Sequence, residues 1–211
     1  MNKKSKSRAW FHQHRNDPFV KEAQQQGYRS RASFKLIEIQ KQYNLIGQRQ
    51  SVCDVGSAPG GWSELAKKWV GPKGKVVACD LLTMEPLDNV IFVQGDFTDS
   101  NTQQALIEAN NKQPFNVIIS DMAPNTMGHQ ATDQLRSIGL VEQLLWFSIQ
   151  HLDPNGSCIV KVFQGVGFDT LVKDFRTHFT KVIIKKPKAS KDASKEVYLI
   201  AIGRKRSDSV T

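Results

Sequence analysis

Cysteine is scarce in this chain, and the few that occur have no ligand or disulfide spacing. Among 211 residues there are 3 Cys and 5 His. Cys53, Cys79 and Cys158 each lie inside an apolar, strand-like run, without a CxxC pair or a nearby His. The sequence therefore indicates neither a disulfide framework nor a zinc site. It is typical of a reduced, intracellular protein with buried thiols.

Long apolar runs are missing as well. No stretch approaches the ~20 apolar residues of a membrane span. The charged N-terminus is followed by no apolar segment of the kind that a signal peptide carries. We therefore expect a soluble, cytoplasmic protein without membrane contacts. At 211 residues and with no internal repeat, the chain is long enough for one α/β domain with a small extension.

Acidic residues are few near the start of the chain. Residues 1–35 hold nine basic residues against two acidic ones, so they carry seven of the nine net positive charges. Such an arm on a nearly neutral domain favours a polyanionic partner, nucleic acid above all, although a merely solvated tail is the alternative. We expect a basic, partly disordered arm over 1–29, a single domain over 30–206 and a frayed tail over 207–211.

The segment Ser51–Trp62 is the centre of the expected domain. Its sequence, SVCDVGSAPGGW, contains a short apolar strand, a glycine turn and the start of a helix. Gly56 and Gly60 let the backbone turn sharply and approach a ligand without a Cβ in the way. A strand, glycine loop and helix in this order are typical of a nucleotide-type site in an open α/β sheet. A tight turn without a ligand is the alternative.

This glycine loop lacks the patterns of the two common phosphate sites. It is neither GxxxxGK[ST] nor GxGxxG, because Ala58 stands where the second glycine of a dinucleotide fingerprint would be. An acid, Asp54, comes just before the loop. The combination suits a ligand without a pyrophosphate, and S-adenosylmethionine is the cofactor that we expect.

Strands and helices alternate along the rest of the chain. The patterns predict helices at 30–45 and 133–152, a turn at 153–156, and a first strand that begins at Ser51. The later strands are expected at 75–80, 89–96, 114–121, 157–163, 181–186 and 196–203. The alternation predicts an α/β, Rossmann-like fold with a mostly parallel, seven-stranded sheet and helices on both faces.

The last two predicted strands break this alternation. No helical period separates Lys186 from Glu196. A parallel crossover usually needs a helix, so we expect these strands to be antiparallel neighbours. An antiparallel last strand starts at the edge where the parallel strands end, which is the ligand-binding edge. Glu196, its first residue, is therefore expected to face the site.

Four aspartates lie in or at the ends of successive predicted strands, namely Asp54, Asp80, Asp96 and Asp121. In this architecture all four are expected to line one crevice, although any one of them could instead cap a helix. Asp80 follows Gly56 at close to the ~20-residue spacing at which an acid receives ribose hydroxyls. Asp96 is expected near the adenine.

Lys161 interrupts an apolar strand. A buried lysine is costly unless it is paired or deprotonated. Burial beside another cation favours the neutral amine, which can act as a base. Lys35, Asp121 and Glu196 are its expected neighbours. A structural salt bridge, or a side chain that reaches the strand end, is the alternative.

Several of these features together resemble a known family. GSAPGGW at 56–62 and SDMAPN at 120–125, with an ordered set of two lysines and two acids, resemble the K-D-K-E ribose 2′-O-methyltransferases. The resemblance is closest to the bacterial FtsJ/RrmJ type, which methylates 23S rRNA of the large ribosomal subunit. It covers nearly the whole chain, and no tetrad position departs from the pattern. The tetrad positions are Lys35, Asp121, Lys161 and Glu196.

The resemblance implies roles for these residues. Lys161 is expected to activate or orient a ribose 2′-hydroxyl, with Lys35 keeping it neutral and Glu196 orienting it by a hydrogen bond. Asp121 is expected to contact both the tetrad and the methionine end of S-adenosylmethionine. Gly56 of the glycine loop is a further candidate for cofactor binding. The cofactor positions that the resemblance implies are Gly60, Trp62, Asp80, Asp96 and Asp121.

The resemblance also implies a partner. We expect methylation of a uridine in large-subunit rRNA, within the 50S subunit, by a monomer without a metal. The basic arm and the lysines of 185–195 would hold the RNA backbone. Methylation of tRNA or of an mRNA cap, which the same tetrad can serve, is one alternative. A non-catalytic RNA-binding factor of ribosome assembly on the same scaffold is the other.

Overall fold

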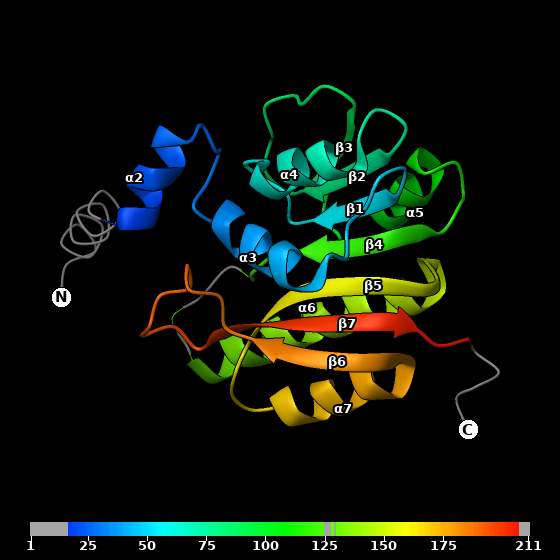
Figure 1. The fold of residues 1–211 in the computed structure, drawn as a ribbon. Coiled ribbons are helices and arrows are strands. Elements are labelled where there is room, and N and C mark those ends of the chain that lie inside the picture. The colour runs from blue at the N-terminus through cyan, green and yellow to red at the C-terminus, as the bar shows by residue number, and fades with distance from the viewer. Residues whose placement is uncertain (1–16, 125–127, 129, 207–211) are drawn as a thin grey trace.

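The computed structural model of the chain describes residues 17–124, 128 and 130–206, and only the backbone of 130 and 131. Its centre is a single seven-stranded sheet with helices on both faces (Figure 1). The predicted tail, 207–211, and residues 1–16 of the predicted arm lie outside the described residues, whereas residues 17–29 of the arm are described.

The strands follow the sheet order β3-β2-β1-β4-β5-β7-β6. The strands β1 to β5 are parallel to one another, and β7 is antiparallel to both β5 and β6. The predicted mostly parallel sheet with an antiparallel last strand is confirmed. The bounds are β1 Ser51–Val55, β2 Lys75–Asp80, β3 Val90–Gln94, β4 Phe115–Ser120, β5 Leu152–Phe163, β6 Phe179–Lys185 and β7 Glu196–Arg204.

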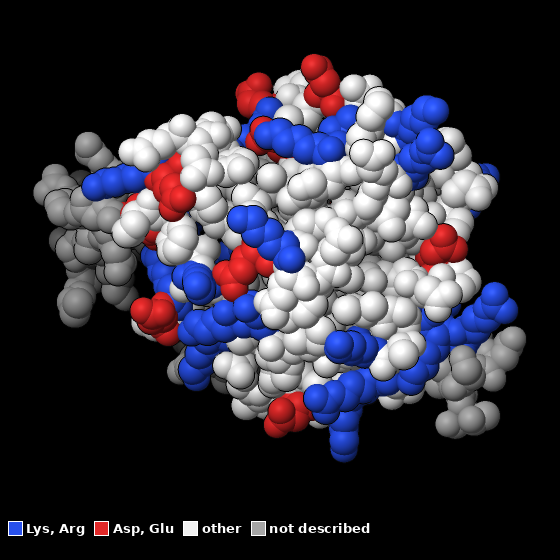
Figure 2. Space-filling model, viewed as in Figure 1, with Lys and Arg blue, Asp and Glu red and all other residues white. Residues whose placement is uncertain are grey.

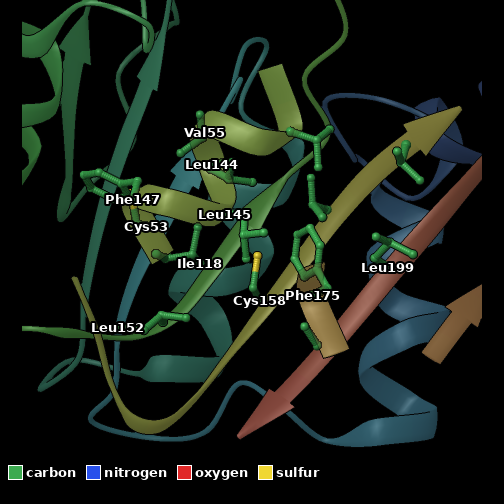
Figure 3. Close-up of a cluster of buried hydrophobic side chains, with 14 of the residues drawn as sticks. Cys53, Val55, Ile118, Leu144, Leu145, Phe147, Leu152, Cys158, Phe175 and Leu199 are labelled. Carbon is green, nitrogen blue, oxygen red and sulfur yellow. The ribbon is translucent and has the colours of Figure 1, made fainter. Parts of the chain in front are cut away.

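The helices form two layers around this sheet. Helices α3 and α4 cover one face, where Leu36 and Trp62 belong to one apolar cluster. Helices α5, α6 and α7 cover the other face, where a larger cluster includes Leu106. Figure 3 shows Leu144 and Phe175 of the same cluster. The bounds are α2 Pro18–Gln25, α3 Ser33–Tyr43, α4 Gly61–Val70, α5 Ser100–Ala109, α6 Gln130–His151 and α7 Phe168–His178.

The three cysteines are buried in the larger cluster with free thiols, as the sequence predicts. Burial raises the pKa of both Cys79 and Cys158 to about 12, so these thiols stay protonated and unreactive near neutral pH. Within the described part of the chain, no group of three or more His, Cys, Asp or Glu side chains is arranged to hold a metal ion. The same residues form no helix long and apolar enough to cross a membrane.

Helix α2 lies inside the segment expected as an arm. Asp17 caps it by accepting a hydrogen bond from the backbone N–H of Phe19 at 3.0 Å, and Pro18 occupies the first turn. Ala23 is buried, and the ring of Phe19 lies 5.7 Å from that of Phe34 on α3. The described end of the arm is therefore a capped helix that packs on the domain.

The turn predicted at 153–156 is wrong as a boundary, because these residues belong to β5. The strand starts at Leu152, directly after α6. Its pairing with β4 shifts register between Phe115 and Val117, and Asn155 has a φ of 70°. The residues DPNG are thus accommodated as an irregularity within a strand rather than as a loop before it.

Candidate active site

A cleft of about 730 Å³ lies where the parallel strands end. Its lining includes Gly56 of the glycine loop, Asp80 at the end of β2, Asp96 after β3 and Asp121 after β4. The strands β2 and β3 follow on one side of β1, whereas β4 and β5 lie on its other side, so the strand order reverses beside β1. Ligands of open α/β sheets bind at this kind of switch point. Four of the predicted cofactor positions therefore share one cleft.

The acids of the cleft are fixed by nearby hydrogen bonds. The carboxylate of Asp80 accepts from the backbone N–H groups of Ala58 and Leu82, each at 2.9 Å. Asp96 Oδ1 accepts from the amide and the hydroxyl of Thr98, both at 2.8 Å. Asp96 Oδ2 has no hydrogen-bond partner among the described residues. Carboxylates that are fixed in place and have acceptor capacity to spare suit the hydroxyl and amino groups of a nucleoside.

Apolar side chains complete the cleft. Leu81 and Leu82 line it and are 57% and 68% exposed, which is unusual for large apolar residues. Phe97 and Leu140 line it too. An adenosine-bearing cofactor requires apolar walls beside its base and carboxylates that accept hydrogen bonds from its ribose hydroxyls, and this cleft has both. The residues present therefore fit S-adenosylmethionine.

Gly56 is required by packing as well as by any ligand. Its φ is 78°, and a Cβ at this position would lie 2.4 Å from Cβ of Met122. Met122 directly follows Asp121, so the glycine loop packs against the segment that carries this tetrad residue. Only glycine allows both the backbone angle and the close approach.

Gly60 and Trp62 lie outside the lining of the cleft. Trp62 is 3% exposed, and its indole N–H donates to the carbonyl of Ala32 at 2.8 Å. Gly60 is the N-cap of α4, with a φ of 103°. Gly60 donates its backbone N–H to the carbonyl of Ser57 at 2.6 Å, and Trp62 lies in the first turn of α4. The buried Trp62 ring therefore does not face this cleft, and contact of either residue with a cofactor stays a prediction.

The expectation that Asp54 lines the crevice is wrong. Asp54 is 1% exposed, and its Oδ2 accepts a hydrogen bond from Ser63 Oγ of α4 at 2.6 Å, while Oδ1 has no partner among the described residues. Burial raises the pKa of Asp54 to about 7, against the effect of the Ser63 hydrogen bonds and with a further rise from the charges of Asp121 and Asp80. The side chain thus fastens β1 to α4 instead of meeting a ligand.

The four tetrad residues meet beside the cleft. Lys161 Nζ lies 3.0 Å from Asp121 Oδ1 and also donates to the backbone carbonyl of Asp121. Lys35 Nζ lies 2.6 Å from Glu196 Oε1 and 3.9 Å from Asp121 Oδ1. These residues come from α3, the end of β4, the interior of β5 and the start of β7. The structure therefore brings together all four residues that the sequence indicates.

The pairing inside the tetrad differs from the expected one. Glu196 binds Lys35, and within the described residues it forms no ion pair with Lys161. Across β5 and β7, Glu196 lies opposite Phe163, two positions beyond Lys161, which separates the two side chains along the strand. Ser190 Oγ fixes the Glu196 carboxylate further at 2.8 Å. Each buried lysine thus has its own carboxylate, as a buried charge requires.

Tyr198 is a further residue of this site, which the sequence patterns did not indicate. It pairs with Lys161 across β5 and β7, and its hydroxyl donates to Asp121 Oδ1 at 2.5 Å. Burial raises the pKa of Tyr198 well above its ordinary value, and the charges of Asp121 and Glu196 add to the rise. The phenol therefore stays a proton donor. Its position two residues after Glu196, on the same face of the strand, is the signal that could have revealed it.

Fold and site together define a class of protein. A Rossmann-like α/β sheet carries a nucleoside-sized cleft at its switch point, and paired lysines and carboxylates stand beside that cleft. The model of the FtsJ-like methyltransferase family matches residues 28–204. The chain belongs to the FtsJ-like methyltransferase family.

Individual relatives agree with this family. A protein of Marinobacter nauticus named ribosomal RNA large subunit methyltransferase E is 50% identical over 203 residues, which cover 96% of this chain and 98% of the relative. The protein of the same name from Acinetobacter baumannii is 49% identical over 201 residues, or 95% and 93% of the two chains. A Plasmodium falciparum structure described as a ribosomal RNA methyltransferase matches with a TM-score of 0.74 and 29% identity, over 84% of this chain and 98% of that one.

Proposed function

We propose that this chain uses S-adenosylmethionine to methylate the ribose 2′-oxygen of a uridine in 23S rRNA of the large ribosomal subunit. The observation that carries the proposal is the buried contact of Lys161 with Asp121, at the edge of a cleft that fits an adenosine-bearing cofactor. The substrate is inferred from the names of relatives at 49–50% identity along nearly the whole chain.

The tetrad has the chemistry that a ribose 2′-hydroxyl needs, because this group is a poor nucleophile until its proton leaves. When bound, S-adenosylmethionine would supply the methyl carbon, which the 2′-oxygen takes up as the carbon–sulfur bond breaks and S-adenosylhomocysteine remains. Lys161 would accept the hydroxyl proton as a neutral amine. Asp121 holds Lys161 Nζ through both its carboxylate and its carbonyl, which fixes the direction of the amine.

The other members of the site hold this pair in place. Tyr198 donates to Asp121, and Lys35 lies 3.9 Å from the same carboxylate oxygen. Glu196 holds Lys35 from the other side. We propose these residues as the positioning groups of the reaction, with Glu196 acting through Lys35.

Lysines around the loop between β6 and β7 supply a surface for the RNA backbone. Figure 2 shows Lys and Arg side chains gathered over β6 and this loop. Lys185 pairs with Glu38 of α3 at 2.9 Å, and Lys186 donates to two carbonyl groups of the loop, so both help to fix its shape. The remaining exposed lysines of the loop can contact phosphates. They are Lys188, Lys191 and Lys195.

Methyl transfer to defined RNAs tests the proposal. Purified protein and labelled S-adenosylmethionine are incubated with large subunits, small subunits, tRNA and capped RNA from cells that lack this protein. We expect label only in large-subunit rRNA. Label only in tRNA or capped RNA would keep the chemistry and overturn the substrate. No label in any RNA, with the cofactor still bound in equilibrium dialysis, would leave a non-catalytic RNA-binding factor as the better explanation.

A further inference from the structure

A second cleft, of about 450 Å³, adjoins the cofactor cleft. Its described lining comes from residues 123–124 after β4, Gly128, residues 133–137 of α6, the end of β5 and residues 194–195 just before β7. Ala123 and Pro124 line both clefts, so the two share a wall that begins next to Asp121. The lining of the second cleft includes Pro124, Gln134, Phe163 and Lys195.

We propose that this second cleft holds the base of the target nucleotide, extruded from its RNA helix, while the cofactor occupies the first. The inference rests on the proposed function and adds the site that selects the nucleotide. Phe163 lies two residues after Lys161 on β5, and Lys195 directly precedes Glu196. A nucleotide in the second cleft therefore has its ribose next to the tetrad. Its base lies beyond the last residue of β5 and the first residue of β7.

The size and lining of the second cleft fit one nucleoside. Its volume of about 450 Å³ falls in the lower part of the range of about 300–1,000 Å³ that is usual for small-ligand sites, which is enough for one nucleoside. Pro124 and Phe163 offer apolar surface to the face of a base. Lys195 is exposed and has no ion-pair partner among the described residues, so it is free to bind a phosphate. A paired base would have to leave its stack to enter.

Gln134 is the group that can read the edge of this base. Its Nε2 donates to the carbonyl of Phe163 at 2.9 Å, which fixes the amide across the gap between α6 and β5. Its Oε1 has no hydrogen-bond partner among the described residues and remains an acceptor. Uracil presents an N3–H donor on its pairing edge, whereas cytosine presents a bare acceptor nitrogen there. An acceptor at this position therefore favours uracil over cytosine.

Photo-crosslinking at the target position tests the placement of the base. Large subunits that carry 4-thiouridine at the methylated nucleotide are irradiated with the full-length protein and S-adenosylhomocysteine, and the crosslinked peptide is identified by mass spectrometry. We expect crosslinks to the cleft segments around Pro124, Gln134 or Phe163. A crosslink elsewhere, on a substrate that is still methylated, would overturn this inference and leave the proposed function intact. Absence of methylation on every RNA would overturn both.

Substitutions separate the base site from the cofactor site. Gln134→Leu should raise the KM for RNA at least tenfold and reduce the preference for uridine over cytidine at the target, with cofactor affinity unchanged within twofold. Gln143→Leu, at an exposed position of the same helix, is the matched control and should change none of these. Lys195→Ala removes an exposed side chain and should not affect folding. It should raise the KM for RNA and leave the affinity for the cofactor unchanged. Wild-type values for both Gln134→Leu and Lys195→Ala would contradict the proposal.

Discussion

The cofactor cleft and the tetrad fix their charged groups in different ways. In the cleft, Asp80 and Asp96 bind backbone and side-chain groups that lie close by, each without help from the other. In the tetrad, Lys35 and Lys161 are held by carboxylates from distant elements, and Asp121 touches both. A substitution in the cleft should therefore affect only the contacts of that residue. A substitution in the tetrad should also destabilise the charged residues that lose their partner.

The largest expected effect is that of Lys161→Ala. The Lys161 amine contacts both the carboxylate and the backbone carbonyl of Asp121, and its loss should lower the rate of methyl transfer by about 10²–10⁴-fold, the usual contribution of a general base. Cofactor affinity should stay within twofold, because Lys161 does not line the cofactor cleft. Single-turnover kinetics and equilibrium dialysis measure the two quantities. Lys181→Ala, on the exposed side of β6, is the matched control, and a joint loss of rate and cofactor binding would break the distinction between the two regions.

Glu196→Gln tests the interdependence of the tetrad. It leaves the buried Lys35 without its 2.6 Å partner, so the free energy of unfolding should fall by about 3 kcal/mol. Adding Lys35→Met should recover part of this loss, because the unpaired charge is then gone. Denaturant titration of the single and double variants measures both effects. Glu142→Gln, at an exposed position of α6, serves as control, and strictly additive losses would show that the two side chains act independently.

Asp54 is buried against α4, and its carboxyl group feels the charges of Asp80 in the cofactor cleft and of Asp121 in the tetrad. Burial raises the pKa of Asp54 to about 7, above the ~3.9 of an unfolded chain. Between these values the folded protein binds the extra proton, so this group makes stability fall as the pH rises towards 7. Asp54→Asn removes that dependence.

The stability of Asp54→Asn relative to the wild type should therefore increase from pH 5 to pH 8, by roughly 2–3 kcal/mol. Denaturant titrations across this range measure it. The exposed residue Asp174 of α7 provides the matched substitution Asp174→Asn, which should leave the pH dependence as in the wild type. A constant difference between Asp54→Asn and wild type at all pH values would contradict the buried, protonated state.

The smallest expected effect is that of Asp96→Asn in the cleft. The amide can still accept from Thr98 through Oδ1, but the free carboxylate oxygen is lost. Cofactor affinity should fall about tenfold, in line with one hydrogen bond to a charged group, and the KM for RNA should not change. Calorimetry with S-adenosylhomocysteine measures the first value. A tenfold change in the KM for RNA instead would show that the cleft and the tetrad are coupled.

Much of this site could be predicted because it depends on strand ends. The carboxyl ends of parallel strands meet at one edge, so Asp80, Asp96 and Asp121 converge whatever the details of the loops. The antiparallel last strand follows from the missing crossover helix, and it brings Glu196 to the same edge. Lys161 is conspicuous because a charge inside an apolar strand needs a partner.

The rest depends on the direction in which side chains turn, and strand positions alone do not fix it. Asp54 stands at a strand end like the other acids, but α4 covers it. Trp62 turns into the core formed by α3 and α4, where its ring lies 5.7 Å from that of Tyr198. The pairing of Glu196 with Lys35 depends on how closely α3 approaches β7. These are packing contacts between elements far apart in the sequence, which local patterns do not encode.

The position of the transferred methyl group is the most direct test of the central claim that Lys161 acts on a ribose hydroxyl. Large-subunit rRNA labelled by the protein is hydrolysed with alkali, which cleaves every linkage whose 2′-oxygen is free. A ribose methyl group must leave one resistant dinucleotide that contains all the label, and Lys161→Ala must abolish it. Label recovered in fully hydrolysed mononucleotides would place the methyl group on a base and contradict the claim.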